Sequence, residues 1–235
     1  MTCLKVPFIS GETQDMDTAL ELGGARFDVC CVNWPETFPY APFCSGRIAR
    51  TQDALVVDFR VSGLDLRARN TEDNLRQWED SCVEVFIKDP VKADYYNFEM
   101  NALGKVLACY GPVREGRTRR PESEMKQILR CAQNDMMLDA SCQNHFMTGG
   151  LSPQTPWVAL LQNKDLEGIQ SWRVGIAIPF GLIGLDPGNL PHSIRANFYK
   201  CGDKTAHPHY LSWSPIDTPR PDFHRPDFFG ELLLD

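Results

Sequence analysis

The sequence predicts an all-β fold, an antiparallel β-sandwich of the immunoglobulin-like or jelly-roll-like kind with one short helix in an insertion. Short runs of alternating apolar and polar residues recur along the chain, turn residues separate them, and helical periodicity is confined to one stretch. Strands spaced in this way, without helices between them, indicate an antiparallel sandwich rather than a parallel α/β sheet.

Alternation defines the individual strands. Residues 47–61 predict a hairpin that turns at residues 51–53, because every second residue from Leu55 to Val61 is apolar. The other predicted strands span residues 82–87, 95–101, 105–111, 157–161, 172–178, 194–199, 210–213 and 230–234.

The same alternation predicts which side chains fill the core, because successive residues of a strand point to opposite faces of its sheet. Residues that share the apolar face of their strand should be buried between two sheets. They are Val83, Val85, Phe98, Ile176 and Phe198.

Residues 121–132 provide the only helix prediction. Pro121 stands near its start, acidic residues come early, and basic residues come later, as the helix dipole favours. We expect one domain over residues 1–235, with residues 112–156 as an insertion outside the sandwich. The stretch 133–155, rich in Asn, Gln, Ser and Gly, should be its least ordered part.

Composition restricts the class of partner. The 235 residues are 43% hydrophobic and 23% charged, which are ordinary values for a globular protein with a full core. A formal net charge of −7 argues against nucleic acid and anionic membranes as partners, and no apolar run approaches the ~20 residues of a membrane span. Neutral ligands such as sugars are compatible with this charge, whereas the oligomeric state is not determined by the sequence.

The amino-terminal residues and the cysteines indicate a cytoplasmic location. Residues 1–10 lack the basic segment and apolar core of a signal peptide. The chain has nine cysteines and no Cys-x-x-Cys pair, so we expect free thiols in a reducing compartment. Cys82, Cys109 and Cys201 fall within or at the ends of predicted strands, where cysteine serves as a small apolar residue.

Three predicted strands share an unusual polar face. Glu84 lies opposite the apolar face of its strand, and so do two further sets on the other strands, Asn97, Glu99 and Asn101, and Arg195, Asn197 and Tyr199. Asparagine is depleted in strands, so these faces favour a binding surface over a merely solvated one.

The tryptophans divide by their position in the strands. Trp172 alternates in register with apolar residues and should belong to the core. Trp78 and Trp213 lie at strand ends among polar residues, where an exposed aromatic ring can pack against the apolar face of a sugar.

These residues give the chain its family resemblance. The runs Trp78-Glu-Asp-Ser-Cys-Val-Glu84, Arg195-Ala-Asn-Phe-Tyr199 and Phe223-His-Arg-Pro226 resemble carbohydrate-binding module family 9, and above all its stand-alone members. The resemblance extends from about Asp28 to the carboxyl-terminal end. It implies a non-catalytic β-sandwich that binds the end of a mono- or disaccharide, with a role in carbohydrate catabolism.

The resemblance also implies roles for individual residues. Trp78 and Trp213 correspond to the two tryptophans that hold the terminal sugar, and Glu84 to a carboxylate that binds its hydroxyls. Asn101 falls near an amide contact of the family, and Glu99 stands where the xylanase-linked modules have arginine. Together with Arg195 and Asn197, these residues are the predicted ligand-binding set.

Other functions remain open on the sequence. Glu84 and Glu99 could act as the two carboxylates of a glycoside hydrolase. A haem-binding sandwich would need an axial ligand such as Met100 or one of Met136 and Met137. We expect no cofactor, although structural calcium would fit the family, with Asp58, Asp80, Asp89, Asp94 and Asp203 as candidate ligands.

One basic run lies outside the predicted strands. Its members are Arg114, Arg117, Arg119 and Arg120. We interpret this run as a solvated loop whose charge is balanced by neighbouring glutamates.

Overall fold

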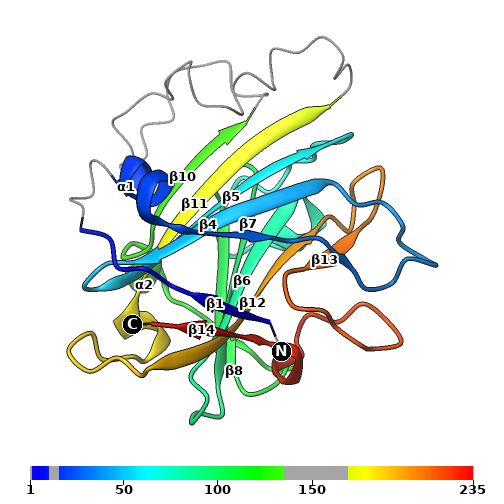
Figure 1. The fold of residues 1–235 in the computed structure, drawn as a ribbon. Coiled ribbons are helices and arrows are strands. Elements are labelled where there is room, and N and C mark those ends of the chain that lie inside the picture. Colours follow the sequence, from blue (N-terminus) through cyan, green and yellow to red (C-terminus); the bar gives the residue numbers. More distant parts are fainter. Residues whose placement is uncertain (1, 11–15, 135–168, 235) are drawn as a thin grey trace.

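Two β-sheets face each other in the computed structural model, which describes residues 2–10, 16–134 and 169–234 (Figure 1). The first, sheet A, has nine strands. Seven follow one another in the order β1 (Cys3–Lys5), β14 (Gly230–Leu233), β12 (Ser193–Cys201), β6 (Cys82–Lys88), β7 (Tyr95–Asn101), β8 (Val106–Gly111) and β9 (Thr118–Arg119). The remaining two, β13 (Tyr210–Ser212) and β3 (Cys31–Val32), extend from β12.

The second sheet, sheet B, has five strands. Their order is β10 (Leu129–Asn134), β11 (Gln170–Pro179), β5 (Ala54–Gly63), β4 (Phe43–Arg50) and β2 (Ala25–Asp28). The named strands pair antiparallel in both sheets except for β1 and β14, which run parallel. The predicted antiparallel β-sandwich is confirmed.

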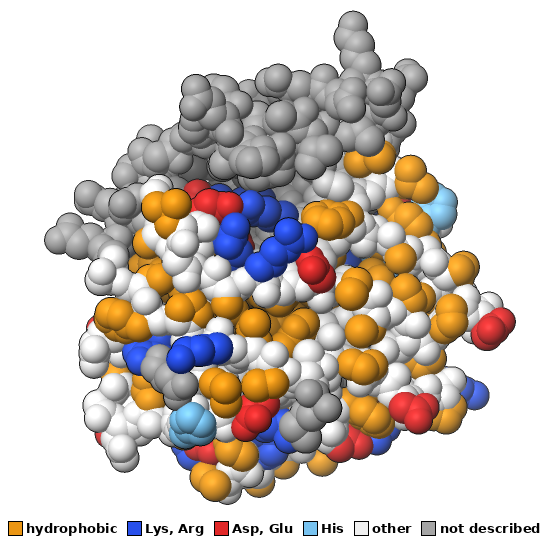
Figure 2. Space-filling view, in the orientation of Figure 1, with side chains coloured by type: hydrophobic (Ala, Val, Ile, Leu, Met, Phe, Trp, Pro, Cys, Tyr) orange, Lys and Arg blue, Asp and Glu red, His pale blue; other side chains and the backbone are white. Residues whose placement is uncertain are grey.

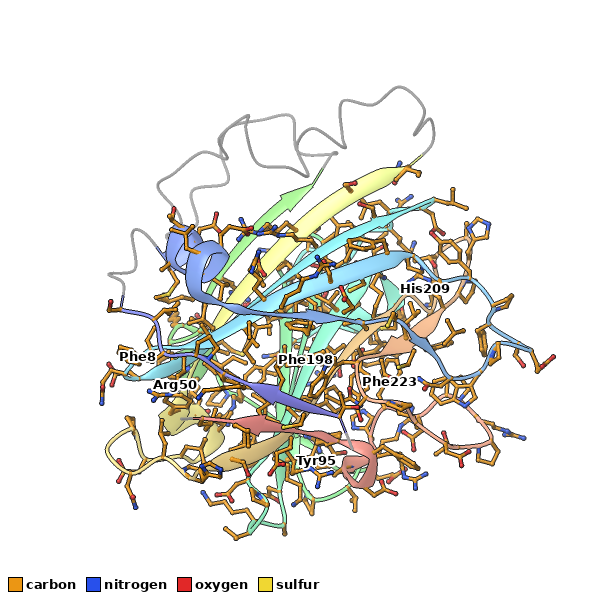
Figure 3. All side chains as sticks on the ribbon, viewed as in Figure 1. Phe8, Arg50, Tyr95, Phe198, His209 and Phe223 are labelled. Atoms are coloured by element: carbon orange, nitrogen blue, oxygen red, sulfur yellow. The ribbon has the colours of Figure 1, made fainter. Side chains whose placement is uncertain are left out.

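The space between the sheets is filled as alternation predicts. Val83, Val85, Phe98, Ile176 and Phe198 are all fully buried in one apolar cluster. The Phe198 ring stacks on Phe27 from sheet B, with ring centroids 4.2 Å apart, and lies near the centre of the molecule in Figure 3.

Helix α1 (Met16–Gly23) covers the outer face of sheet B. Met16 and Leu20 pack on small residues of that face, and Glu21 pairs with Arg47 and Arg60. Basic and acidic side chains accordingly gather beside α1 in Figure 2. This helix is not among the elements expected from the sequence.

The expected helix over residues 121–132 is wrong beyond its first turn. Helix α2 spans only Glu122–Met125, and the chain then turns into β10, which pairs with β11. Met125 and Ile128 are both buried by this turn, so their apolar spacing is satisfied without a longer helix.

Because β9 and β10 extend the two sheets, the described part of residues 112–156 is not separate from them. The expected strand at 157–161 and residues 135–155 of the expected low-order stretch lie outside the described residues.

The amino-terminal segment bonds to both sheets. β1 pairs with β14 at the edge of sheet A, and the Val6 amide donates to Leu233 O. Further on, the Ile9 amide donates to Arg50 O and the Arg50 amide to Pro7 O, at the end of β4 in sheet B. Figure 3 shows Phe8 and Arg50 side by side where the segment reaches sheet B.

Phe198→Ala should lower the free energy of unfolding by about 3–5 kcal/mol, because it removes a fully buried ring from the contact between the sheets. Phe43→Ala is the matched control. Its ring is 56% exposed, so the loss should stay within about 0.5 kcal/mol. Denaturant unfolding of both variants measures the difference, and equal losses would contradict the assigned core.

Candidate functional site

A pocket of ≈ 390 Å³ opens on the outer face of sheet A, the face turned away from sheet B. Strands β6 to β9 and the end of β12 form its floor, and segments after β12 and before β14 form its walls. The residues that line it are Trp78, Glu84, Asn97, Glu99, Leu107, Cys109, Arg114, Arg117, Arg119, Cys201, Asp203, Tyr210, Pro221, Asp222, Phe223 and His224.

Two carboxyl groups lie on the floor. Glu84 and Glu99 are directly opposite each other in the register of β6 and β7 and are only 3% and 4% exposed. Glu84 Oε1 accepts from Cys201 Sγ at 3.1 Å, and Glu99 Oε1 accepts from Asn97 Nδ2 at 2.8 Å. Glu99 Oε2 is buried without a hydrogen-bond partner. An acceptor left in this state is costly, so a ligand that donates to it would gain binding energy.

Burial sets the charge of this floor. Desolvation raises the pKa of Glu84 well above its usual range, and the neighbouring Cys201 and Glu99 raise it further. Desolvation also raises the pKa of Glu99 to about 7, although the hydrogen bond from Asn97 and the Arg117 charge oppose this shift. The pKa of Asp203 is raised by the same cause. The pocket therefore favours neutral carboxyl groups, which donate and accept hydrogen bonds.

Aromatic side chains form part of the wall. Trp78, in the 3₁₀ turn η2 (Gln77–Glu79), is partly buried, and its carbonyl accepts from the Asp203 amide at 3.0 Å. This bond ties the Trp78 turn to the segment that follows β12. On the opposite wall, Phe223 stacks on Tyr199 with ring centroids 4.1 Å apart, and Tyr210 packs beside Phe223. Phe223 and Tyr95, which lie to one side of Phe198 in Figure 3, belong to this outer aromatic cluster.

The basic run is only in part the solvated loop that the sequence suggested: Arg114 and Arg119 are exposed, whereas Arg117 is half-buried and Arg120 is buried. Arg114, Arg117 and Arg119 line the pocket, and Arg120 is buried against Glu124 and Leu182 O. Arg117 Nε donates to Asn97 Oδ1 at 2.9 Å, and its guanidinium lies 3.8 Å from the centroid of the Tyr95 ring. It thereby fixes the Asn97 amide that in turn donates to Glu99.

Trp78, Glu84 and Glu99 of the predicted set come together in this pocket, whereas the other predicted residues do not line it. Asn101 closes the turn after β7, where its Oδ1 accepts from the Leu103 and Lys105 amides. Arg195 lies toward the far end of β12 and donates to Phe229 O and Gly230 O. Asn197 is fully buried and exchanges two hydrogen bonds with the backbone of Ser214.

The expectation that Trp213 is exposed is wrong. Only 9% of this residue is exposed, and its ring packs on Phe198 between the sheets, with centroids 5.3 Å apart. The ring also covers Gly230, where an added Cβ would lie 2.5 Å from a ring atom. Alternation explains the placement: Leu211 and Trp213 point to the core, so Tyr210 points to the pocket.

The sequence reasoning missed several lining residues. Asn97 was placed on the polar face of its strand beside Glu99 but was left out of the predicted ligand-binding set, and Tyr210 could have been found from the alternation of β13. Phe223 and Asp222 come from a segment without regular structure, so no periodicity signals that they return to the pocket.

The sequence model of carbohydrate-binding family 9 matches residues 16–148 and 151–234. The chain belongs to carbohydrate-binding family 9. A search of curated protein sequences finds no match.

Solved structures support the family assignment. A candidate carbohydrate-binding protein from Bacteroides uniformis ATCC 8492 is 29% identical, with a TM-score of 0.79 over 100% of this chain and 99% of that one. A family 9 module from Caldicellulosiruptor kristjanssonii in complex with glucose is 12% identical, with a TM-score of 0.54 over 100% and 96% of the two chains. A family 9 module from the same organism in complex with cellotriose is 11% identical, with a TM-score of 0.52 over 99% of this chain and 93% of that one. The last two likenesses establish a shared fold.

The candidate calcium ligands do not gather in the part of the chain that the structure describes. Within these residues, the one group of three or more metal-ligating side chains is Cys82, Glu84 and Cys201. Asp58 is held instead by the Arg173 guanidinium. The free cysteines are Cys3, Cys30, Cys31, Cys44, Cys82, Cys109 and Cys201. No helix within the described residues is long and apolar enough to cross a membrane.

Glu99→Gln should flatten the pH dependence of stability. Because burial raises the pKa of Glu99 from 4.5 to about 7, its contribution is fully present below the usual carboxyl range and is lost as the pH rises through about 7. The free energy of unfolding should thus fall by roughly 1–3 kcal/mol between about pH 5 and pH 8 in the unmodified protein, and by less in the variant. Denaturant unfolding across this range tests the prediction.

Glu36→Gln, at an exposed position, is the matched control and should keep the unmodified profile. The prediction would be contradicted if the free energy of unfolding of Glu99→Gln fell with pH as steeply as that of this control. Glu99 would then be ionised in the folded protein throughout this pH range.

Proposed function

We propose that this protein binds the end of a mono- or disaccharide in the pocket on the outer face of sheet A, without catalysing a reaction. The observation that carries the proposal is the buried, unpartnered Oε2 of Glu99 beneath a partly aromatic wall. A sugar hydroxyl can donate to that oxygen while the apolar face of the ring packs on Trp78.

The composition of the pocket supports a neutral, polyhydroxylated ligand. Its floor combines carboxyl groups with the Asn97 amide, and Asp203 adds a further oxygen at the wall. The raised pKa values of Glu84, Glu99 and Asp203 disfavour a high density of negative charge, so an organic cation, which cannot bind by coordination, gains less from this site than from an ionised one. Two of the arginines in the lining already have partners, because Arg114 pairs with Asp222 and Arg117 bonds to Asn97 and to Tyr95 O. Hydroxyl groups, which both donate and accept, match carboxyl groups in either protonation state.

Pocket size and neighbouring structures support a short ligand. The volume of ≈ 390 Å³ is near the lower end of the range for small-molecule sites, about 300–1,000 Å³. The two Caldicellulosiruptor modules with this fold were solved with glucose and with cellotriose. Because cellotriose is a fragment of cellulose, we extend the proposal to a role in carbohydrate catabolism.

The residues assigned to binding are revised from those that the sequence suggested. Trp78, Glu84 and Glu99 remain, and Asn97, Tyr210 and Phe223 take the places of Asn101, Arg195, Asn197 and Trp213. Stacking on an aromatic ring contributes about 0.5–1.5 kcal/mol beyond area burial, and each hydrogen bond about 1 kcal/mol. We therefore expect dissociation constants on the order of micromolar to millimolar.

A glycoside hydrolase that uses Glu84 and Glu99 is the second candidate function. Directly opposite residues on neighbouring strands have Cβ atoms about 4.5–5.5 Å apart, which is close to the carboxyl separation of retaining hydrolases, about 5–5.5 Å. Against it, both groups project from the same face of the sheet and both have raised pKa values, so neither is prepared as an ionised nucleophile.

Titration calorimetry with a panel of mono- and disaccharides tests the proposal. Trp78→Ala should weaken the affinity for the best ligand roughly tenfold, because the stacking surface is lost, with little change in the thermal midpoint. Trp213→Ala is the matched control. It should lower the free energy of unfolding by about 3–5 kcal/mol, because its ring belongs to the core.

Three outcomes would count against non-catalytic binding in this pocket. They are the absence of binding across the panel, full affinity in both Trp78→Ala and Glu99→Gln, and release of hydrolysis products by the unmodified protein but not by Glu84→Gln. The last outcome would establish the hydrolase instead.

A further inference from the structure

Two buried thiols lie beside Glu84 at the floor of the pocket. Cys82 and Cys201 are directly opposite each other in the register of β6 and β12, and both are essentially inaccessible to solvent. Their sulfur atoms and a carboxylate oxygen of Glu84 all lie within 4.8 Å of one another. Cys201 Sγ is 3.1 Å from Glu84 Oε1. Three side chains from two strands thus point their donor atoms at one location.

We propose that Cys82, Cys201 and Glu84 bind a thiophilic divalent cation such as Zn²⁺. Thiolate sulfur lies about 2.3 Å from zinc and carboxylate oxygen about 2.0–2.2 Å. Tetrahedral coordination then places two sulfurs about 3.8 Å apart and a sulfur and an oxygen about 3.5 Å apart. No pair of the three donors exceeds these spacings by more than about 1.3 Å, so small shifts of the side chains would bring them to coordination distance.

The pocket supplies the route to this site and room for a fourth ligand. Glu84 and Cys201 both line the pocket, whereas Cys82 lies behind them. Glu99, opposite Glu84, brings its unpartnered Oε2 to the same side. A site with three protein ligands and one position open to a cavity is the arrangement of zinc sites that exchange a water or a small ligand.

The charges around the cluster are compatible with a cation. Two thiolates and one carboxylate balance a dipositive ion together with the Lys200 ammonium, which interacts electrostatically with both sulfurs. Without a metal, the hydrogen bond with Cys82 and then burial raise the pKa of Cys201, and burial raises the pKa of Cys82, so binding must displace the protons of both thiols into solution. Glu99, Asp203, Tyr199 and Tyr210 also interact electrostatically with members of the cluster, and none of these four groups carries a positive charge.

Cobalt titration under reducing conditions tests the site, because Co²⁺ replaces Zn²⁺ in tetrahedral sites and reports on its ligands. The protein used is the full chain with serine in place of Cys3, Cys30, Cys31, Cys131 and Cys142. We expect one Co²⁺ per chain, a sulfur-to-cobalt charge-transfer band, and displacement of the cobalt by Zn²⁺.

Variants assign the ligands. Cys82→Ser and Cys201→Ser should abolish the charge-transfer band or reduce it by half, and Glu84→Gln should weaken cobalt affinity at least about tenfold. Cys109→Ser is the matched control, because Cys109 lines the same pocket but does not belong to the cluster. It should leave the titration unchanged.

Zinc-edge X-ray absorption is measured on the protein with Cys82, Cys201 and Glu84 intact. Its result therefore does not depend on whether the variants fold. Two sulfurs at about 2.3 Å and at least one oxygen in the first shell support the site. No stoichiometric binding, a first shell with fewer than two sulfurs, or a band that disappears in Cys109→Ser would overturn it. The sugar titrations are a separate measurement, so a chain that binds cobalt but no saccharide refutes the proposed function alone.

Discussion

Inter-sheet packing around Phe198 is the constraint on which the rest of the structure depends. Its ring stacks on Phe27 from the opposite sheet and contacts Trp213, so β12 can present only one of its faces to the core. Since residues of a strand alternate, burial of Phe198 turns Cys201 outward. Strands β6 and β7 obey the same rule through Val85 and Phe98, which direct Glu84 and Glu99 to the outer face. A slip of one residue would exchange the core and the pocket floor.

This face of sheet A differs from an ordinary solvated face because a second aromatic cluster covers it. Phe86, Tyr95 and Tyr199 form its base, and the segment around Phe223 and Phe229 packs over them. The cover withdraws Glu84 and Glu99 from water and thereby changes their protonation. Burial of these two carboxyl groups lowers the stability of the fold. Such a loss of stability is common where a protein holds polar groups in place for a ligand.

Alternation made the central strands predictable, and its limits explain what was missed. The faces predicted to be apolar in β6, β7 and β12 are the faces that the structure packs between the sheets, because the side chains of both sheets meet there. Trp213 was placed wrongly because its position at a strand end among polar residues was given more weight than its alternation with Leu211, which points to the core. The helix at 121–132 failed since pairing with β11 outweighs a local preference. Arg117 reaches the pocket through contacts between distant segments, which no local pattern encodes.

The amino-terminal segment has a consequence for how the molecule avoids self-association. By pairing with β14 and then with the end of β4, residues 3–9 occupy backbone groups at the margins of both sheets. An uncovered strand margin of this kind is a template on which a second chain can add a strand. The segment therefore leaves no room for a second chain to pair with β14 or with the end of β4 at these positions, and β1 becomes the edge of sheet A in place of β14.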